Sequence, residues 1–177
     1  EWMQSLAPEV KSRFRMGRYM DDVLTVVARD GTWSANEWQR DFERSECYWP
    51  PLKLEPAEAT CFLETRIEMG DDGMFRHRLK NTNEGREEEP KIWRYHRWDS
   101  FSPEAMKLGV IVGCLHKVGL MASDAAGFWL SLNCKLREFY VLGYPSGTLR
   151  KALERMYART GYRRWLKARV LLTQMEE

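Results

Sequence analysis

Two adjacent aspartates, Asp21 and Asp22, are the residues of this chain whose types and spacing best suit chemistry. Tyr19 and Met20 precede them and a β-branched run, residues 23–27, follows, a pattern that predicts a strand, a tight acidic turn and a second strand. Two neighbouring carboxylates repel each other unless a cation joins them. The arrangement therefore suits metal-dependent phosphoryl transfer. Turn statistics offer a simpler alternative, a solvated Asp-Asp turn.

The elements after this turn must hold it in place. Ser34 and Glu37 form a capping box that predicts a helix over residues 34–46. From residue 60, apolar and polar residues alternate up to a turn at residues 70–73 and again over residues 74–80, which predicts a second β-hairpin. The acidic pair in that turn, Asp71 and Asp72, lies between glycines and is interpreted as solvated and structural.

The second half of the chain has the pattern of a helical bundle. A polar, acidic loop over residues 81–90 divides the chain into two expected subdomains, residues 1–90 and 91–177. Helix starts are predicted with Ser102 as cap and Pro103 as first residue, at Ser123-Asp124, and with Ser146 as cap. Gly161 separates the third helix from a last, basic one. The predicted class is α+β.

Composition excludes a disordered chain, because 44% of the 177 residues are hydrophobic. The net charge is only +2, yet residues 150–169 carry eight cations against Glu154 alone, a local charge of +7. With Tyr157, Tyr162 and Trp165 interleaved, these cations could follow a phosphate backbone while the rings stack on bases. The alternative is a solvated amphipathic helix. The eight candidates for nucleic-acid binding are Arg150, Lys151, Arg155, Arg159, Arg163, Arg164, Lys167 and Arg169.

The spacing of the cysteines and the hydropathy of the sequence indicate where in the cell the protein is expected. The four cysteines have no C-x-x-C spacing, which predicts reduced thiols in an intracellular protein and does not distinguish the nucleus from an organelle. Cys114 and His116 are expected on one helix and not in a zinc site. No apolar stretch reaches the roughly 20 residues needed to span a bilayer. Since the chain begins at Glu1, we expect it to be part of a longer protein.

The string Tyr19-Met20-Asp21-Asp22 is similar to the catalytic signature of reverse transcriptases. The order of acidic hairpin, helix, second hairpin and helices resembles the C-terminal part of their palm, followed by a thumb-like bundle. Shorter matches resemble the enzymes of non-viral retroelements, most closely Penelope-like elements. The first match is Cys61-Phe62-Leu63-Glu64, which is similar to a Phe-Leu-Asp strand of these enzymes. The second consists of His96, Ser100, Pro103 and Lys107, which are similar to the palm-to-thumb junction. The third is Gly143-Tyr144-Pro145, which is similar to a turn between thumb helices.

This resemblance implies an RNA-directed DNA polymerase that transfers nucleotides to a primer 3′-hydroxyl with two Mg²⁺ ions. Asp21 would be a direct metal ligand, and Asp22 a second ligand or an electrostatic support. Tyr19 and Met20 would shape the floor near the primer end. Such a palm takes a third aspartate from an earlier strand, and its fingers hold the incoming nucleotide. Both are expected before residue 1.

We therefore expect the chain alone to be inactive as a nucleotidyltransferase, and three explanations stay open. It could be the palm and thumb of a polymerase completed by another chain or a preceding segment. It could be a domesticated fragment, an RNA-binding structural subunit of a ribonucleoprotein. It could be an α+β interaction domain with an accidental match. The first two predict a nucleic-acid partner, RNA or an RNA/DNA duplex.

Overall fold

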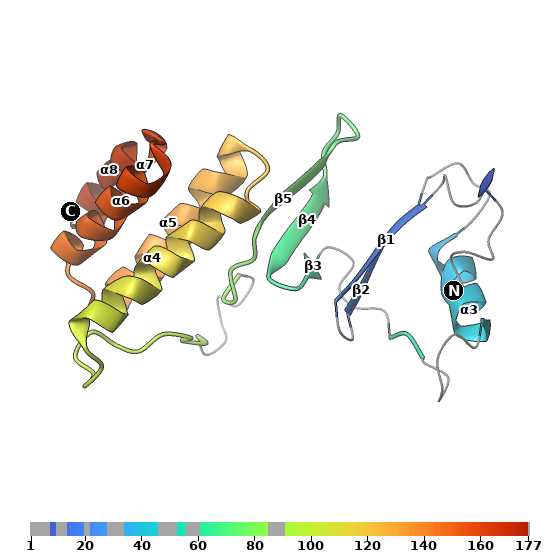
Figure 1. The fold of residues 1–177 in the computed structure, drawn as a ribbon, viewed down its shortest axis with the longest axis horizontal. Helices are drawn as coiled ribbons and strands as arrows, with labels where there is room; N and C mark the ends of the chain where they lie inside the picture. The colour runs from blue at the N-terminus through green and yellow to red at the C-terminus, as the bar shows by residue number, and fades with distance from the viewer. Residues whose placement is uncertain are drawn as a thin grey trace. The chain divides into compact units, whose positions relative to one another are not determined.

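The computed structural model of the chain describes residues 8–9, 14–19, 22–27, 34–45, 53–55, 61–84 and 91–176. Its elements follow the order of an α+β protein, with small antiparallel sheets first and a helical bundle after them (Figure 1). The chain divides into two units, Glu1–Leu63 and Glu64–Glu177. The division lies before the second hairpin, which groups with the helices, whereas the sequence suggested a boundary after residue 90.

The acidic string lies on an antiparallel hairpin in the first unit. Strand β1 (Phe14–Tyr19) pairs with β2 (Asp22–Val27), with Tyr19 opposite Asp22. The two predicted strands are thereby confirmed, because the β-branched run forms β2 and the basic, apolar stretch forms β1. Met20 and Asp21, which separate the paired residues in the sequence, lie outside the described residues.

Helix α3 (Ala35–Arg44) begins with the predicted capping box. The Glu37 amide donates to Ser34 Oγ at 3.2 Å, and the Ser34 amide donates to Glu37 Oε2 at 2.7 Å. Trp38 and Phe42, four residues apart, are buried and stack with ring centroids 5.6 Å apart. The short strand β3 (Cys61–Phe62) ends the first unit.

The second unit begins with the predicted hairpin, in which β4 (Thr65–Met69) pairs with β5 (Phe75–Leu79). Asp72 accepts hydrogen bonds from Arg76 at 2.6 Å and from the Met74 amide at 3.0 Å, so its predicted structural role is confirmed. The expectation of one alternating strand from residue 60 is wrong. Leu63 has a φ of 55°, in the left-handed region, which interrupts the extended chain between β3 and β4.

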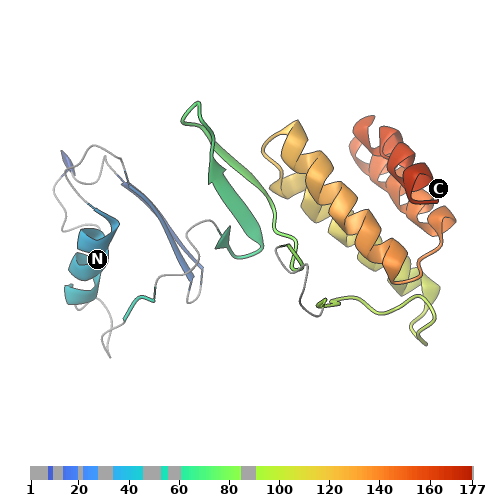
Figure 2. The same cartoon turned by 180° about the vertical axis from the view of Figure 1, so that it is seen from behind.

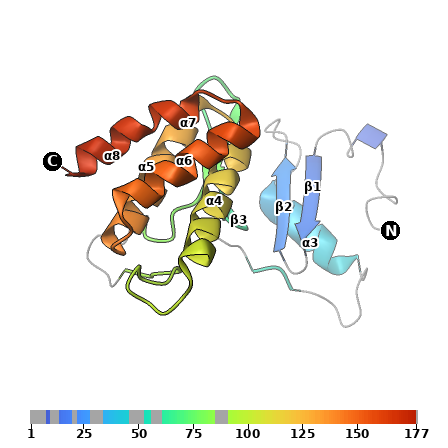
Figure 3. The same cartoon turned by 60° about the vertical axis from the view of Figure 1, so that its left-hand side comes forward.

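Among the residues that the structure describes after the hairpin, five helices follow: α4 (Glu104–Met121), α5 (Ala125–Val141), α6 (Ser146–Thr160), α7 (Arg164–Lys167) and α8 (Arg169–Glu176). Two opposite views show α4 and α5 between the hairpin on one side and α6, α7 and α8 on the other (Figures 1 and 2). Figure 3 shows the chain turning back at the end of α6, so that α7 and α8 run beside it in the opposite direction.

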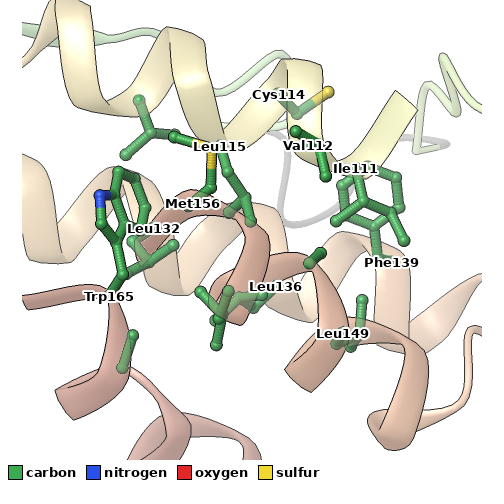
Figure 4. Close-up of a cluster of buried hydrophobic side chains, with 14 of the residues drawn as sticks. Ile111, Val112, Cys114, Leu115, Leu132, Leu136, Phe139, Leu149, Met156 and Trp165 are labelled. Carbon is green, nitrogen blue, oxygen red and sulfur yellow. The ribbon is translucent and has the colours of Figure 1, made fainter. Parts of the chain in front are cut away.

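Apolar side chains from α4, α5, α6 and α7 meet between the helices and form the core of the second unit (Figure 4). Leu115, Leu132, Leu136 and Leu149 are fully buried there. Full burial of such a side chain contributes roughly 1.5–3 kcal/mol. On the other side of α4 and α5, Leu79 of β5 is also buried, and Ser131 Oγ donates to its carbonyl at 3.4 Å. The hairpin is thus anchored to the helices.

Two of the predicted helix starts are wrong in detail. Asp124 caps α5 as expected, since its side chain accepts from the Gly127 amide at 2.6 Å. Ser102 does not cap α4; its hydroxyl lies 3.1 Å from His96 Nδ1, and Pro103 holds the cap position. Ser146 is likewise the first residue of α6, after a proline cap. Proline fixes φ near the value that the entering chain needs, so no hydroxyl cap is required.

Candidate functional site

Asp22 stands at the end of the acidic hairpin, where its side chain is exposed. It lines a cavity of about 400 Å³ in the first unit, together with Val23, residues of α3 and the segment around residue 54. Of the predicted site residues on this hairpin, the structure describes the backbone of Tyr19 and the side chain of Asp22. Met20 and Asp21 lie outside the described residues.

The wall of this cavity is fixed by hydrogen bonds from α3. Gln39 Nε2 donates to the Leu54 carbonyl at 2.6 Å and to Glu43 Oε1 at 3.1 Å, and the Leu54 amide donates to the same carboxylate at 2.7 Å. These donors, the Leu54 amide above all, lower the pKa of Glu43. Asp22 therefore lines a cavity that also includes two residues, Gln39 and Leu54, held together by a hydrogen bond.

Asp22 offers carboxylate oxygens, which are the ligands that Mg²⁺ prefers. Asp21 is also an aspartate and carries the same donor atoms. Within the described ranges, no three acidic, histidine or cysteine side chains lie close enough to hold a metal ion. The donors therefore fit Mg²⁺ in kind and fall short in number.

The basic region separates into two groups of side chains. Five exposed cations recur every fourth residue, and no ion pair to them is found in the part of the chain that the structure describes: Lys151, Arg155, Arg159, Arg163 and Lys167. Three of them, Lys151, Arg155 and Arg159, lie on α6 and are called the basic stripe; Arg163 and Lys167 follow the end of α6 at Gly161. Arg150 and Arg169 instead form ion pairs with Glu176 at 3.3 Å and Glu154 at 2.5 Å.

Arg164 and Trp165 differ from their sequence interpretation. The Arg164 guanidinium lies 4.2 Å from the centroid of the Phe128 ring and 5.1 Å from that of Tyr162, so it is held by cation–π contacts. Trp165 is 1% exposed and packs edge-on against Phe128 at 5.1 Å. Stacking of Trp165 on a base is excluded in this conformation, because the ring belongs to the core.

The basic stripe borders a groove between α4 and α6. Gly109 and Gly113 line one side, and Arg155 and Arg159 line the other, around a volume of about 530 Å³. A Cβ added at either glycine would meet no heavy atom within 4 Å outside its own helix turn. A ligand backbone can therefore approach α4 closely while the arginines reach its charges.

The residues that carry the resemblance in the second unit converge on one junction. Lys107 Nζ donates to the carbonyls of Trp98 at 2.5 Å and Ser100 at 2.7 Å, and Tyr144 Oη donates to the His96 carbonyl at 3.0 Å. The Trp98 and Tyr144 rings lie 5.3 Å apart. Segments 96–107 and 143–145, which are far apart in the sequence, thus fix the connection into the bundle.

Sequence reasoning missed a buried ion pair in α5. Lys135 Nζ donates to Glu138 Oε2 at 2.7 Å, with both side chains about 95% buried. The available signal was their position among the apolar residues Leu132, Leu136 and Phe139, where a charged residue needs a partner.

Comparison with known proteins returned no match: no protein-family model, no curated protein and no solved structure is similar to the chain. Among the described helices, none is both long enough and apolar enough to cross a lipid bilayer.

Proposed function

We propose that the chain is the C-terminal palm and thumb portion of an RNA-directed DNA polymerase and acts with an upstream palm and fingers part. The single observation that carries this proposal is the antiparallel pairing of β1 and β2 with Tyr19 opposite Asp22, the first and last residues of the Tyr-Met-Asp-Asp string in the sequence. Support comes from the helical unit that follows, with its basic stripe and its groove of glycines and arginines.

In this proposal the acidic residues bind metal and the basic residues bind phosphates. Asp21 and Asp22 would hold Mg²⁺, which when bound supplies Lewis-acid activation of the primer 3′-hydroxyl and neutralises phosphate charge. Lys151, Arg155 and Arg159 would contact successive phosphates, since positions four apart on a helix share one face. Because the palm of such an enzyme takes a third aspartate from an earlier strand, we expect nucleotide addition to require the assembled polymerase.

A second candidate function is a non-catalytic, RNA-binding structural subunit of a ribonucleoprotein. The observation in its favour is the groove between α4 and α6 with Arg155 and Arg159 on its side, which offers contacts to phosphates and needs no metal for them. Both candidates predict nucleic-acid binding. They differ in whether Asp21 matters for any activity.

The experiment that separates them is primer extension by the intact polymerase carrying Asp21→Asn. Loss of nucleotide addition by about 100-fold or more, with unchanged binding of primer-template, supports the polymerase. Asp72→Asn is the matched control, because Asp72 belongs to the other acidic pair and contacts Arg76 in an exposed turn. Full extension by the Asp21 variant favours the structural subunit.

A further inference from the structure

An exposed aromatic ring, that of Tyr162, stands where the chain leaves α6 and enters α7. Tyr162 is 59% exposed and follows Gly161, whose left-handed φ of 69° ends α6. It does not line the groove between α4 and α6, where Arg155 and Arg159 stand. The surroundings of Tyr162 therefore form a separate feature of the helical unit.

One face of the Tyr162 ring contacts a cation that the core holds in place. The Arg164 guanidinium lies over this ring, 5.1 Å from its centroid, and over the Phe128 ring at 4.2 Å. Phe128 is 1% exposed and packs edge-on against the buried ring of Trp165. A guanidinium stacks favourably on aromatic faces. The Tyr162 ring is thus connected to the core through Arg164.

The other face of the Tyr162 ring is open to solvent. The side chain stays more than half exposed although the Arg164 guanidinium covers one face. In the part of the chain that the structure describes, no second aromatic ring stacks on it. A flat, largely apolar surface is therefore available to a flat ligand.

The backbone fixes the position of this ring. The Tyr162 amide donates to Thr160 Oγ1 at 3.3 Å, and the Tyr162 carbonyl accepts from the Trp165 amide at 3.1 Å. Trp165 in turn belongs to the buried core. Little backbone freedom remains to be lost when a ligand binds, which favours affinity.

Two exposed cations, Arg163 and Lys167, adjoin the ring. Neither forms an ion pair within the described ranges. The Lys167 amide donates to the Arg163 carbonyl at 3.1 Å, so the two side chains leave the same side of one helical turn. The sequence has no acidic residue from 155 to 169. The surroundings of the ring are therefore positive and suit a polyanion.

The combination of an open aromatic face with adjoining cations sets the class of ligand. Proteins bind single-stranded nucleic acid with such rings, on which bases stack, and with cations that follow the backbone. Inside a duplex, neighbouring base pairs cover both faces of each base, so a protein ring stacks on bases that are unpaired. The surface at Tyr162 therefore suits an unpaired strand better than the interior of a duplex.

We propose that Tyr162 is a stacking platform for an unpaired base of single-stranded nucleic acid, with Arg163 and Lys167 in contact with the neighbouring phosphates. The inference rests on the proposed function in one respect, nucleic-acid binding by the helical unit. It adds a site for an unpaired strand beside the groove, and it uses no residue of the acidic hairpin.

Fluorescence anisotropy with the full chain tests the platform. The probe is an end-labelled oligothymidylate of about ten nucleotides, within the usual length of such sites, and the reference is an abasic strand of equal length and charge. We expect the strand with bases to bind at least about tenfold more tightly, because the abasic strand cannot stack. Equal affinity for the two strands would overturn the proposal.

Substitutions at Tyr162 locate the stacking. Tyr162→Leu keeps an apolar side chain without a ring and should lose about tenfold in affinity for oligothymidylate, with no change for the abasic strand. Tyr162→Phe should bind both strands like the parent chain, because the ring is kept. Tyr140→Leu is the matched control, since Tyr140 is 39% exposed and lies on α5. Unchanged binding of oligothymidylate by Tyr162→Leu would refute the platform.

Two double variants separate this site from the proposed function. Arg163→Gln with Lys167→Gln should weaken both strands by the same factor, because phosphate contacts carry no base information; unchanged affinity would contradict the inferred contacts. Arg155→Gln with Arg159→Gln should weaken double-stranded primer-template and keep the preference for the strand with bases. Loss of primer-template binding without any such preference in the parent chain refutes the platform alone. The preference with unweakened primer-template binding refutes the groove alone.

Discussion

The two units of this chain differ in where their candidate site residues lie relative to their buried apolar side chains. In the first unit, Trp38 and Phe42 are the buried apolar side chains among the described residues, and Asp22 stands exposed at a hairpin end. The second unit has a continuous core across its helices, with its polar sites arranged around that core. Among the described residues, the motif best suited to metal chemistry therefore lies in the unit with fewer buried apolar side chains, and the basic stripe and its groove lie in the unit with the continuous core.

The largest effect is expected at the buried ion pair of the second unit. Lys135→Ala leaves the Glu138 carboxylate buried without its partner and should lower the free energy of unfolding by about 3–5 kcal/mol. The double variant Lys135→Met with Glu138→Leu should recover most of that loss, since neither charge stays behind. Denaturant unfolding measures both. A loss below about 1 kcal/mol in the single variant would show that water reaches this pair.

A core truncation tests whether the units are energetically separate. Leu132→Ala should destabilise the helical unit by about 2–5 kcal/mol, because Leu132 is fully buried. Leu130→Ala on the same helix, 47% exposed, should change stability by about 0.5 kcal/mol or less. Hydrogen exchange measured over residues 34–45 should not respond to either. Faster exchange there in the Leu132 variant would contradict the contrast between the units.

The capping box offers the corresponding change in the first unit. Ser34→Ala removes the acceptor of the Glu37 amide and should cost about 1 kcal/mol of local stability in α3. Hydrogen exchange of the first turn of α3 should quicken, while the helices of the second unit keep their protection. Ser146→Ala is the control, because Ser146 makes no capping hydrogen bond.

The smallest effect concerns pH. The pKa of Glu64 is lowered in the folded chain from its ordinary value of 4.5, chiefly by Lys117, so the folded state binds this proton less readily than the unfolded state. The stability contributed by Glu64 is complete above about pH 4.5 and is lost as pH falls through the lowered pKa. Acid titration of unfolding should therefore be shallower in Glu64→Gln. Identical titration curves would show that its ion pairs are fully screened.

The sequence predicts local structure well where one residue type controls a backbone group. Ser34 and Glu37 cap α3, Asp124 caps α5, and Gly161 ends α6 with a φ of 69°. The predicted serine caps of α4 and α6 were wrong, because a proline holds the N-cap position of both helices. The prediction failed also at Leu63, whose left-handed conformation follows no preference of leucine.

The candidate sites were less predictable because they depend on which side chains meet. Arg164 and Arg155 look alike in the sequence, yet the first is held by aromatic rings and the second lines a groove. Only tertiary packing separates them. The rings at Arg164 are those of Phe128 on α5 and Tyr162 before α7, and no local pattern brings these two together. For the buried ion pair, the charges inside the apolar face of α5 were the one available sign.

The most direct measurement is steady-state primer extension by the intact polymerase at varied primer-template concentration, comparing Asp21→Asn with the double variant Arg155→Gln and Arg159→Gln. We predict that the Asp21 variant loses kcat and keeps its affinity for primer-template. The arginine variant should raise KM about tenfold and retain kcat at saturation. Full kcat in the Asp21 variant, or equal loss of kcat in both, would contradict a division between a chemical hairpin and a nucleic-acid-binding bundle.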